Sequence, residues 1–125
     1  MAENFLGSAR SGEEINLDAG QALFTKGDVG HELYVVRSGE LQILDGNRVF
    51  EVVGPGGIVG EMALIDGGPR SATVRASTAS EVVPFDERRF LFMVQQTPHF
   101  ALRVMRVMSS RLRAMNARAT ELDKA

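Results

Sequence analysis

Glycine-rich turns divide residues 14–85 into short apolar segments, and this pattern restricts the fold more than any other feature of the chain. Several segments alternate apolar and polar side chains, as in the stretch Glu40-Leu41-Gln42-Ile43-Leu44, which is the period of a half-buried strand. Turn residues such as Asp45-Gly46-Asn47 separate them and predict tight hairpins. About seven or eight short strands at this spacing predict an antiparallel β-sandwich or barrel.

The hydrophobic period changes after Phe85. Asp86 is suited to cap a helix over residues 87–96, because its carboxylate can accept a backbone N–H of the first turn. Thr97 and Pro98 then predict the start of a second helix, which we expect to run to about residue 120. The chain is therefore expected to be mainly β, with two helices at its C-terminal end.

Residues 59–74 combine glycines, a short apolar turn and one arginine. Gly60 allows another group to approach the backbone closely, because it has no Cβ. Residues 61–65 can form one helical turn, whose first N–H groups are a ready anion site. The corner at residues 67–69 then turns the chain back, so that the guanidinium of Arg70 can reach the same anion.

Glu61 needs a different role, since a carboxylate accepts hydrogen bonds and repels anions. It is suited to hydroxyl groups on the same ligand, and an anion beside hydroxyls describes a sugar phosphate. The alternative is an ordinary surface ion pair between Glu61 and Arg70 next to an ordinary turn.

This stretch resembles the phosphate-binding cassette of the cyclic-nucleotide-binding domains, a family whose pattern reads Phe-Gly-Glu-(Leu or Met)-Ala-Leu, a short turn, then Pro-Arg-(Ala, Ser or Thr)-Ala-Thr. The departure is Val59, where the family usually has Phe. The resemblance implies a jelly-roll-like antiparallel β-roll over residues 14–85, with the cassette at 59–74, and helices over 86–121 of which the last is a lid. One domain would occupy residues 1–125. The matching residues are Gly60, Glu61, Met62, Ala63, Leu64, Pro69, Arg70, Ser71, Ala72 and Thr73.

The resemblance also implies roles for individual residues. Glu61 would hold the ribose 2′-hydroxyl, Arg70 would pair with the cyclic phosphate, and backbone amides near Ala63 would add phosphate contacts. Arg111 interrupts the apolar stripe of the last helix and is our candidate for the residue that reaches the base; its alternative is a stem along the stripe with the guanidinium in solvent. The implied ligand-binding residues are Gly60, Glu61, Met62, Ala63, Arg70, Ser71 and Arg111.

The resemblance favours cAMP as ligand, because serine is common at the position of Ser71 in bacterial cAMP receptors. The alternative is cGMP, since members selective for cGMP often carry a hydroxyl there, whereas cAMP-selective eukaryotic members often carry alanine. No cofactor or metal is expected. A cupin enzyme or a haem sensor would need clustered ligands, whereas the chain has two histidines, His31 and His99, and no cysteine. No residue is placed to attack a phosphate, so we interpret the chain as a binding protein and not an enzyme.

The net charge of −2 argues against direct nucleic-acid binding. We expect a cyclic-nucleotide sensor in the cytoplasm, or at the cytoplasmic face of a membrane if the chain is a piece of a channel. No signal peptide or membrane span is evident, and residues 1–12 are expected to be a poorly ordered or helical lead-in. Other expected partners are an effector domain and a second copy through the C-terminal helix. The alternative function is a ligand-free family member that serves as an interaction module through this helix.

Overall fold

The computed structural model describes residues 13–124, so the expectation for residues 1–12 lies outside the described part. The chain divides into two compact units, with the boundary between Leu91 and Phe92. The single domain expected over residues 1–125 therefore stays a prediction. The first unit contains the strands and the cassette; the second contains the long C-terminal helix.

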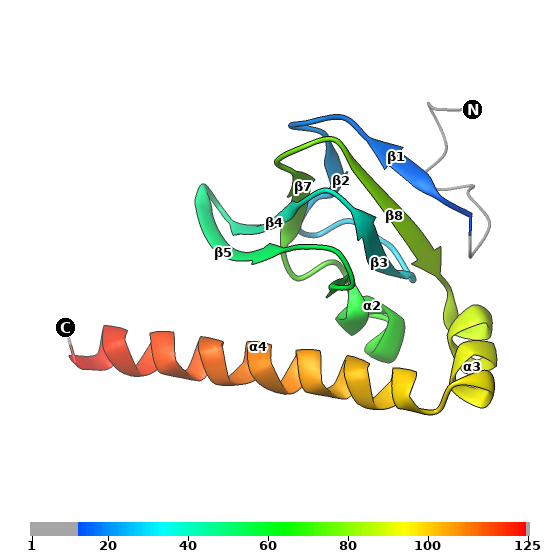
Figure 1. Cartoon of the computed structure of the whole chain (residues 1–125). Helices are drawn as coiled ribbons and strands as arrows, with labels where there is room; N and C mark the ends of the chain where they lie inside the picture. Colours follow the sequence, from blue (N-terminus) through cyan, green and yellow to red (C-terminus); the bar gives the residue numbers. More distant parts are fainter. Residues whose placement is uncertain (1–12, 125) are drawn as a thin grey trace. The chain divides into compact units, whose positions relative to one another are not determined.

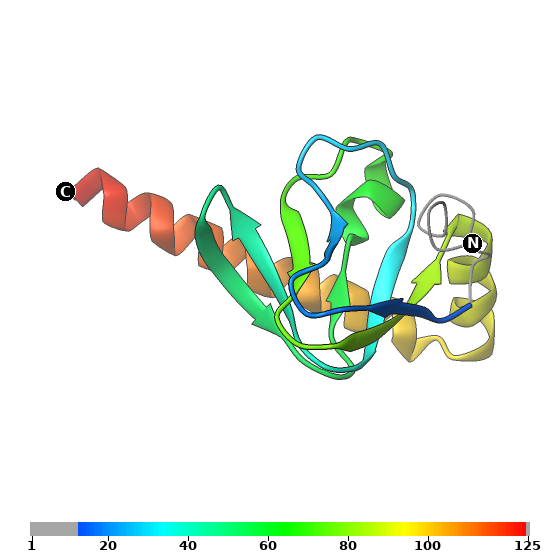
Figure 2. The ribbon, with the colours of Figure 1, turned by 90° about the horizontal axis from the view of Figure 1, so that it is seen from above.

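Within the described residues, eight strands form two four-stranded antiparallel sheets, with orders β1-β8-β3-β6 and β2-β7-β4-β5 (Figures 1 and 2). This arrangement confirms the predicted antiparallel β-roll. Strand β6, Ile58–Val59, was not predicted, because Val59 was assigned to the cassette and two residues show no strand period. The strands are β1 Ile15–Leu17, β2 Ala22–Phe24, β3 Leu33–Ser38, β4 Leu41–Asp45, β5 Arg48–Val53, β6 Ile58–Val59, β7 Thr73–Ala76 and β8 Ser80–Phe85.

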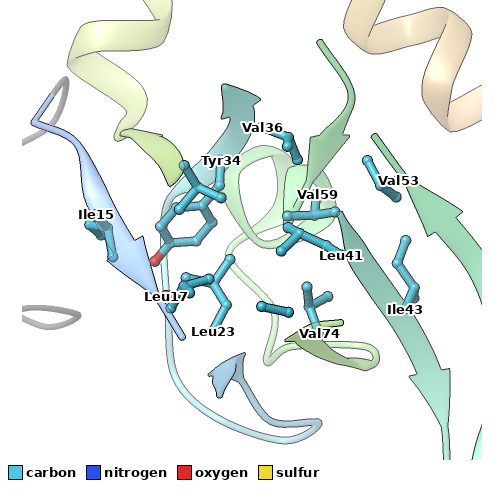
Figure 3. Close-up of a cluster of buried hydrophobic side chains, with 12 residues drawn as sticks. Ile15, Leu17, Leu23, Tyr34, Val36, Leu41, Ile43, Val53, Val59 and Val74 are labelled. Atoms are coloured by element: carbon cyan, nitrogen blue, oxygen red, sulfur yellow. The ribbon is translucent and has the colours of Figure 1, made fainter. Parts of the chain in front are cut away.

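The core of the roll lies between the two sheets. Apolar side chains of β1, β3 and β6 point toward those of β2, β4, β5 and β7 (Figure 3). Alternation along β4 explains this, because Leu41 and Ile43 face inward while Gln42 between them is half-buried. The cluster consists of Ile15, Leu17, Leu23, Tyr34, Val36, Leu41, Ile43, Val53, Val59, Val74, Ala76 and Val82.

The predicted hairpin joins β4 and β5. Leu41 pairs with Val53, and Asp45 pairs with Arg48 at the turn. Gly46 in this turn has φ +62°, a left-handed conformation that glycine adopts without a steric penalty. The hairpin prediction is confirmed, and the register places alternate β4 side chains in the core.

Helix α3, Glu87–Gln96, has the predicted bounds, and its cap is confirmed because the Arg89 N–H donates to Asp86 Oδ1 at 2.8 Å. Helix α4 spans His99–Lys124 and continues a turn beyond the predicted end. Within α4, Met105, Leu112 and Met115 are each more than half exposed. No helix within residues 13–124 is long and apolar enough to cross a lipid bilayer.

Candidate ligand-binding site

The cassette is built on the six-residue helix α2, Glu61–Asp66, which lies between two glycines. Gly60 precedes it with φ +79°, and Gly67 follows it with φ +72°, both in the left-handed region that glycine favours. The Gly67 N–H closes the helix by donating to the Ala63 carbonyl at 3.0 Å. The predicted helical turn is thus present, and its bounds are set by these two glycines.

Arg70 lies inside the roll, with a relative exposure of 4%. Its Nη1 donates to the Glu32 carbonyl at 2.7 Å and, more weakly, to the Gly60 carbonyl at 3.4 Å. Its Cζ lies 4.2 Å from the ring centroid of Phe24 and 5.6 Å from that of Tyr34, so that both rings contribute cation–π attraction. Its buried Nε has no hydrogen-bond partner among the described residues.

The loop between β2 and β3 holds the backbone of Arg70 in place. The Gly27 N–H donates to the Arg70 carbonyl at 2.8 Å, and the Arg70 N–H donates to the Asp28 carbonyl at 2.9 Å. The Lys26 N–H adds a bond to Thr73 Oγ1 at 3.0 Å. The loop therefore fixes both the main chain of Arg70 and, through Glu32, its guanidinium.

Glu61 is the second buried charged residue of the cassette, with 6% exposure. It belongs to the first turn of α2, next to Gly60, whose carbonyl accepts from Arg70. On the outer side, the Ser71 hydroxyl donates to the Met62 sulfur at 3.8 Å. The two halves of the predicted cassette thus meet, with two buried opposite charges and an exposed rim.

The structure brings together six of the seven predicted site residues in the first unit: Gly60, Glu61, Met62, Ala63, Arg70 and Ser71. Arg111 belongs to the second unit, in α4, where it is half-buried. Its contact with a ligand stays a prediction.

Tyr34 reports on the electrostatics around Arg70. Burial raises the pKa of its phenol to about 12, and the nearby Glu32 carboxylate acts in the same direction. The positive charge of Arg70 partly offsets these effects. The phenol consequently stays neutral at physiological pH and acts as an uncharged wall beside the guanidinium.

Sequence reasoning missed the surroundings of Arg70. Phe24 and Tyr34 lie in strands and Gly30 lies in a loop, and the sequence patterns single out none of the three. No spacing in the sequence relates these residues to Arg70, because their contact depends on how β2 and β3 pack. Gly30 in the β2–β3 loop was the one available signal of this contact, since glycine also marks places where another group approaches the backbone closely.

A separate depression of about 390 Å³ lies beside α2. Neither Arg70 nor Glu61 lines it, although most of its lining comes from the α2 part of the cassette. Its lining residues are His31, Ala63, Leu64, Ile65, Asp66, Gly67 and Glu87.

The first unit is thus an antiparallel β-roll that encloses an arginine beside a short helix flanked by glycines. Comparison with known proteins gives the family: residues 14–97 match the model for the cyclic nucleotide-binding domain, and the chain belongs to this family. The family is a ligand-binding regulatory domain and is not catalytic.

Two curated relatives show the range of proteins that contain such a domain. The chain is 33% identical over 99 residues to the cyclic AMP receptor protein of Thermus thermophilus. The aligned residues cover 75% of the chain and 46% of the relative. The chain is 29% identical over 108 residues to the lysophospholipase NTE1 of Chaetomium globosum. The aligned residues cover 82% of the chain and 7% of that relative. The chain thus spans less than half of either protein.

Solved structures confirm the fold. The Thermus thermophilus catabolite activator protein is similar with a TM-score of 0.77 and 27% identity, over 90% of this chain and 55% of that one. A protein from a cyclic-GMP-dependent signalling pathway of bacterial phytopathogenesis has a TM-score of 0.67 and 29% identity, over 93% and 94% of the two chains.

Proposed function

We propose that this domain binds a cyclic nucleotide, cAMP in preference to cGMP, in the cassette around α2. The observation that carries the proposal is the pair of buried charges, Glu61 and Arg70, at a glycine-lined bend. Arg70 would hold the cyclic phosphate, and Glu61 would accept from the ribose 2′-hydroxyl. The buried Nε of Arg70, which lacks a partner in the described chain, would gain an anionic acceptor, a charge-assisted bond in a partly dry site.

The other cassette residues complete the proposed contacts. Backbone N–H groups near Ala63 would bind the phosphate. Gly60, at the N-cap position of α2, makes no side-chain hydrogen bond to the first N–H groups of this helix. Met62 and Ser71 would form the exposed rim, close to the base. The preference for cAMP is supported by the similarity to a cyclic AMP receptor protein, whereas the cyclic-GMP-dependent neighbour makes cGMP the competitor to test.

The proposed output is a change in the position of α4. Ligand binding would bias an open–closed equilibrium of this helix, with Arg111 reaching the base when the helix closes. The division of the chain between Leu91 and Phe92 supports this role, because it places α4, together with the end of α3, in a different unit from the cassette. The domain would act in the cytoplasm, alone or attached to an effector such as a transcription regulator, an enzyme or a channel.

A second copy is the proposed partner of α4. Leu112 and Met115 are exposed by 59% and 57%, and Met105 by 58%, and their spacing of seven and three residues places them along one seam of a coiled coil. A ligand-free interaction module is the alternative function, and it would use the same seam.

Titration calorimetry with cAMP and cGMP tests the proposal. We expect the native chain to bind, and Arg70→Ala to lose roughly 2–4 kcal/mol of affinity, the cost of truncating one partner of a buried charge pair. Arg48→Ala, which removes an exposed arginine of β5, is the matched control and should leave the affinity unchanged. The absence of binding heat with both nucleotides, together with an unchanged melting temperature, would favour the interaction module.

A further inference from the structure

Two glycines of the β2–β3 loop are required for different reasons. Gly27 has φ +92°, and a Cβ built on it would meet nothing within 4 Å in the described chain. Gly30 is not among the glycines with positive φ, so its backbone is one that other residues can adopt. A Cβ on Gly30 would, however, lie 2.5 Å from both Nε and Nη2 of Arg70 and 2.7 Å from Cζ. Position 30 is therefore limited by the guanidinium and not by the turn.

Gly60 limits the guanidinium from another direction. A Cβ there would lie 2.8 Å from Arg70 Nη1 and 2.9 Å from the Glu32 carbonyl oxygen. Together with the ring of Phe24, 4.2 Å from Cζ, these groups enclose the planar group. We call Phe24, Gly30, Glu32, Tyr34 and Gly60 the guanidinium slot.

The slot divides the donors of Arg70 between two tasks. Nη1 is used internally, because it bonds the carbonyls of Glu32 and Gly60. Nε is buried without a partner in the described residues, which carries a free-energy cost until an acceptor arrives. Such an arrangement orients the guanidinium before a ligand binds, and preorganisation reduces the cost of binding.

We propose that Gly30 is a positioning residue that sets the affinity of the cassette for its anion. The absence of a side chain at position 30 allows the guanidinium to stay in the slot, with Nη1 on the carbonyls of Glu32 and Gly60. Any side chain there displaces the guanidinium, which can move because it is the end of a flexible side chain. This inference rests on the proposed function for its effect on affinity, but the slot itself can be tested without a ligand.

The test without a ligand is a ¹⁵N-correlated NMR spectrum of the arginine Nε–H groups. The native chain should show one Nε–H that exchanges slowly, because it is buried, and that lies in the field of the Phe24 ring; Arg70→Lys, which has no Nε–H, identifies it by its loss. Gly30→Ala should shift this signal and remove its protection. Gly54→Ala is the matched control, since Gly54 also lacks a positive φ and a Cβ there meets no described atom within 4 Å. An unchanged signal in Gly30→Ala would overturn the slot.

The test with a ligand is calorimetry with cAMP on the same variants. Gly30→Ala should bind on the order of tenfold more weakly, as expected when a charge-assisted hydrogen bond is misplaced, and Gly54→Ala should bind as the native chain does. In the Arg70→Ala background, Gly30→Ala should cause no further loss, because it acts through Arg70. Equal affinities of Gly30→Ala and the native chain, or losses that add in the double variant, would overturn the positioning role.

The two tests distinguish a failure of the proposed function from a failure of the inference about Gly30. If the native chain binds neither cAMP nor cGMP, the proposed function and the effect of Gly30 on affinity both fail, while the NMR result still decides whether Gly30 holds the guanidinium. If the native chain binds and Gly30→Ala binds equally well, the function stands and the inference fails. Thermal melting of each variant tests whether a loss of affinity reflects unfolding, and Gly30→Ser is a second variant with a side chain at this position.

Discussion

The β-roll buries most of its large apolar side chains, whereas helix α4 buries Phe100 and Val104 but leaves Met105, Leu112 and Met115 exposed. Within the roll, Leu41 is fully buried between the sheets, with 0% exposure, whereas Leu112 on α4 is 59% exposed. The sheets face each other, so each covers the apolar side of the other. A helix whose apolar residues are exposed gains little stability from them until another surface covers them.

This difference in burial agrees with two proposed tasks, ligand binding by the roll and a response by α4. The roll contains its own core and holds both charges of the cassette, so the proposed phosphate and ribose contacts need no residue from outside it. Helix α4 leaves Met105, Leu112 and Met115 exposed, and the proposed response would depend on what covers them. A sensor needs both properties, a site that is already formed and an element whose position a ligand or partner can change.

The same substitution at the two leucines gives the largest expected contrast. Leu41→Ala should lower the free energy of unfolding of the roll by about 3–4 kcal/mol, because it leaves a cavity in a closed core. Leu112→Ala should change it by less than about 0.5 kcal/mol, as expected for an exposed position. Urea denaturation followed by the fluorescence of Tyr34, the only tyrosine in a chain without tryptophan, measures the roll.

The leucine comparison also tests the seam of α4. If Leu112→Ala costs more than about 2 kcal/mol, and the native midpoint rises with protein concentration, then a second copy covers the helix. Sedimentation equilibrium of the native chain and Leu112→Ala would show the matching change in mass. Equal losses at both leucines without any concentration dependence would contradict the contrast between the two regions.

Alkaline pH should give the next largest change in the free energy of unfolding, and this change should arise from Tyr34 in the roll. The pKa of Tyr34 is raised from 10.0 to about 12, so above pH 10 the unfolded chain loses this proton before the folded chain does. Its contribution is complete below pH 10 and should be lost as the pH rises toward 12, by about 2–3 kcal/mol in total. Denaturation at pH 9 and pH 11.5 measures it, and Tyr34→Phe should remove this part of the pH dependence. A Tyr34→Phe chain with the native pH profile would show that the phenol is not buried.

Glu61 sharpens the comparison within the cassette. Glu61→Gln keeps the size of the side chain but removes the charge that would strengthen the hydrogen bond from a ribose hydroxyl. We expect affinity for cAMP to fall by about 1.5 kcal/mol, roughly tenfold, as measured by calorimetry. Glu87→Gln, at an exposed carboxylate, is the control, and an equal affinity for Glu61→Gln and the native chain would remove Glu61 from the site.

The smallest expected effect concerns the end of α2. Gly67 has φ +72° and a Cβ there would meet no described atom within 4 Å, so Gly67→Ala tests backbone strain alone. It should lower the free energy of unfolding by about 1 kcal/mol, while Gly54→Ala should be neutral or slightly stabilising. Equal melting temperatures for the two variants would show that α2 can end without the left-handed residue.

Local patterns predicted the strands and helices well where they depend on short-range chemistry. The alternation in residues 40–44, the turn at residues 45–47 and the cap at Asp86 all describe interactions between neighbours in the chain. Strand β6 was missed because two residues show no period; they form a strand because Tyr34 and Val35 pair with them across the sheet. The cassette spacing also identified Glu61 and Arg70, since its residues lie within one short segment.

The sequence by itself determined the antiparallel strands, the two C-terminal helices and the helical turn of the cassette, because strand alternation, turn glycines and helix caps act over a few residues. Only the tertiary structure decided where the guanidinium of Arg70 lies, since Phe24, Glu32 and Tyr34 reach it from 36 to 46 positions away through the packing of β2 and β3. The same packing places Gly30 against the guanidinium of Arg70. A turn glycine and a glycine that makes room for a side chain are identical in sequence, and the difference is which atoms the fold brings within van der Waals distance.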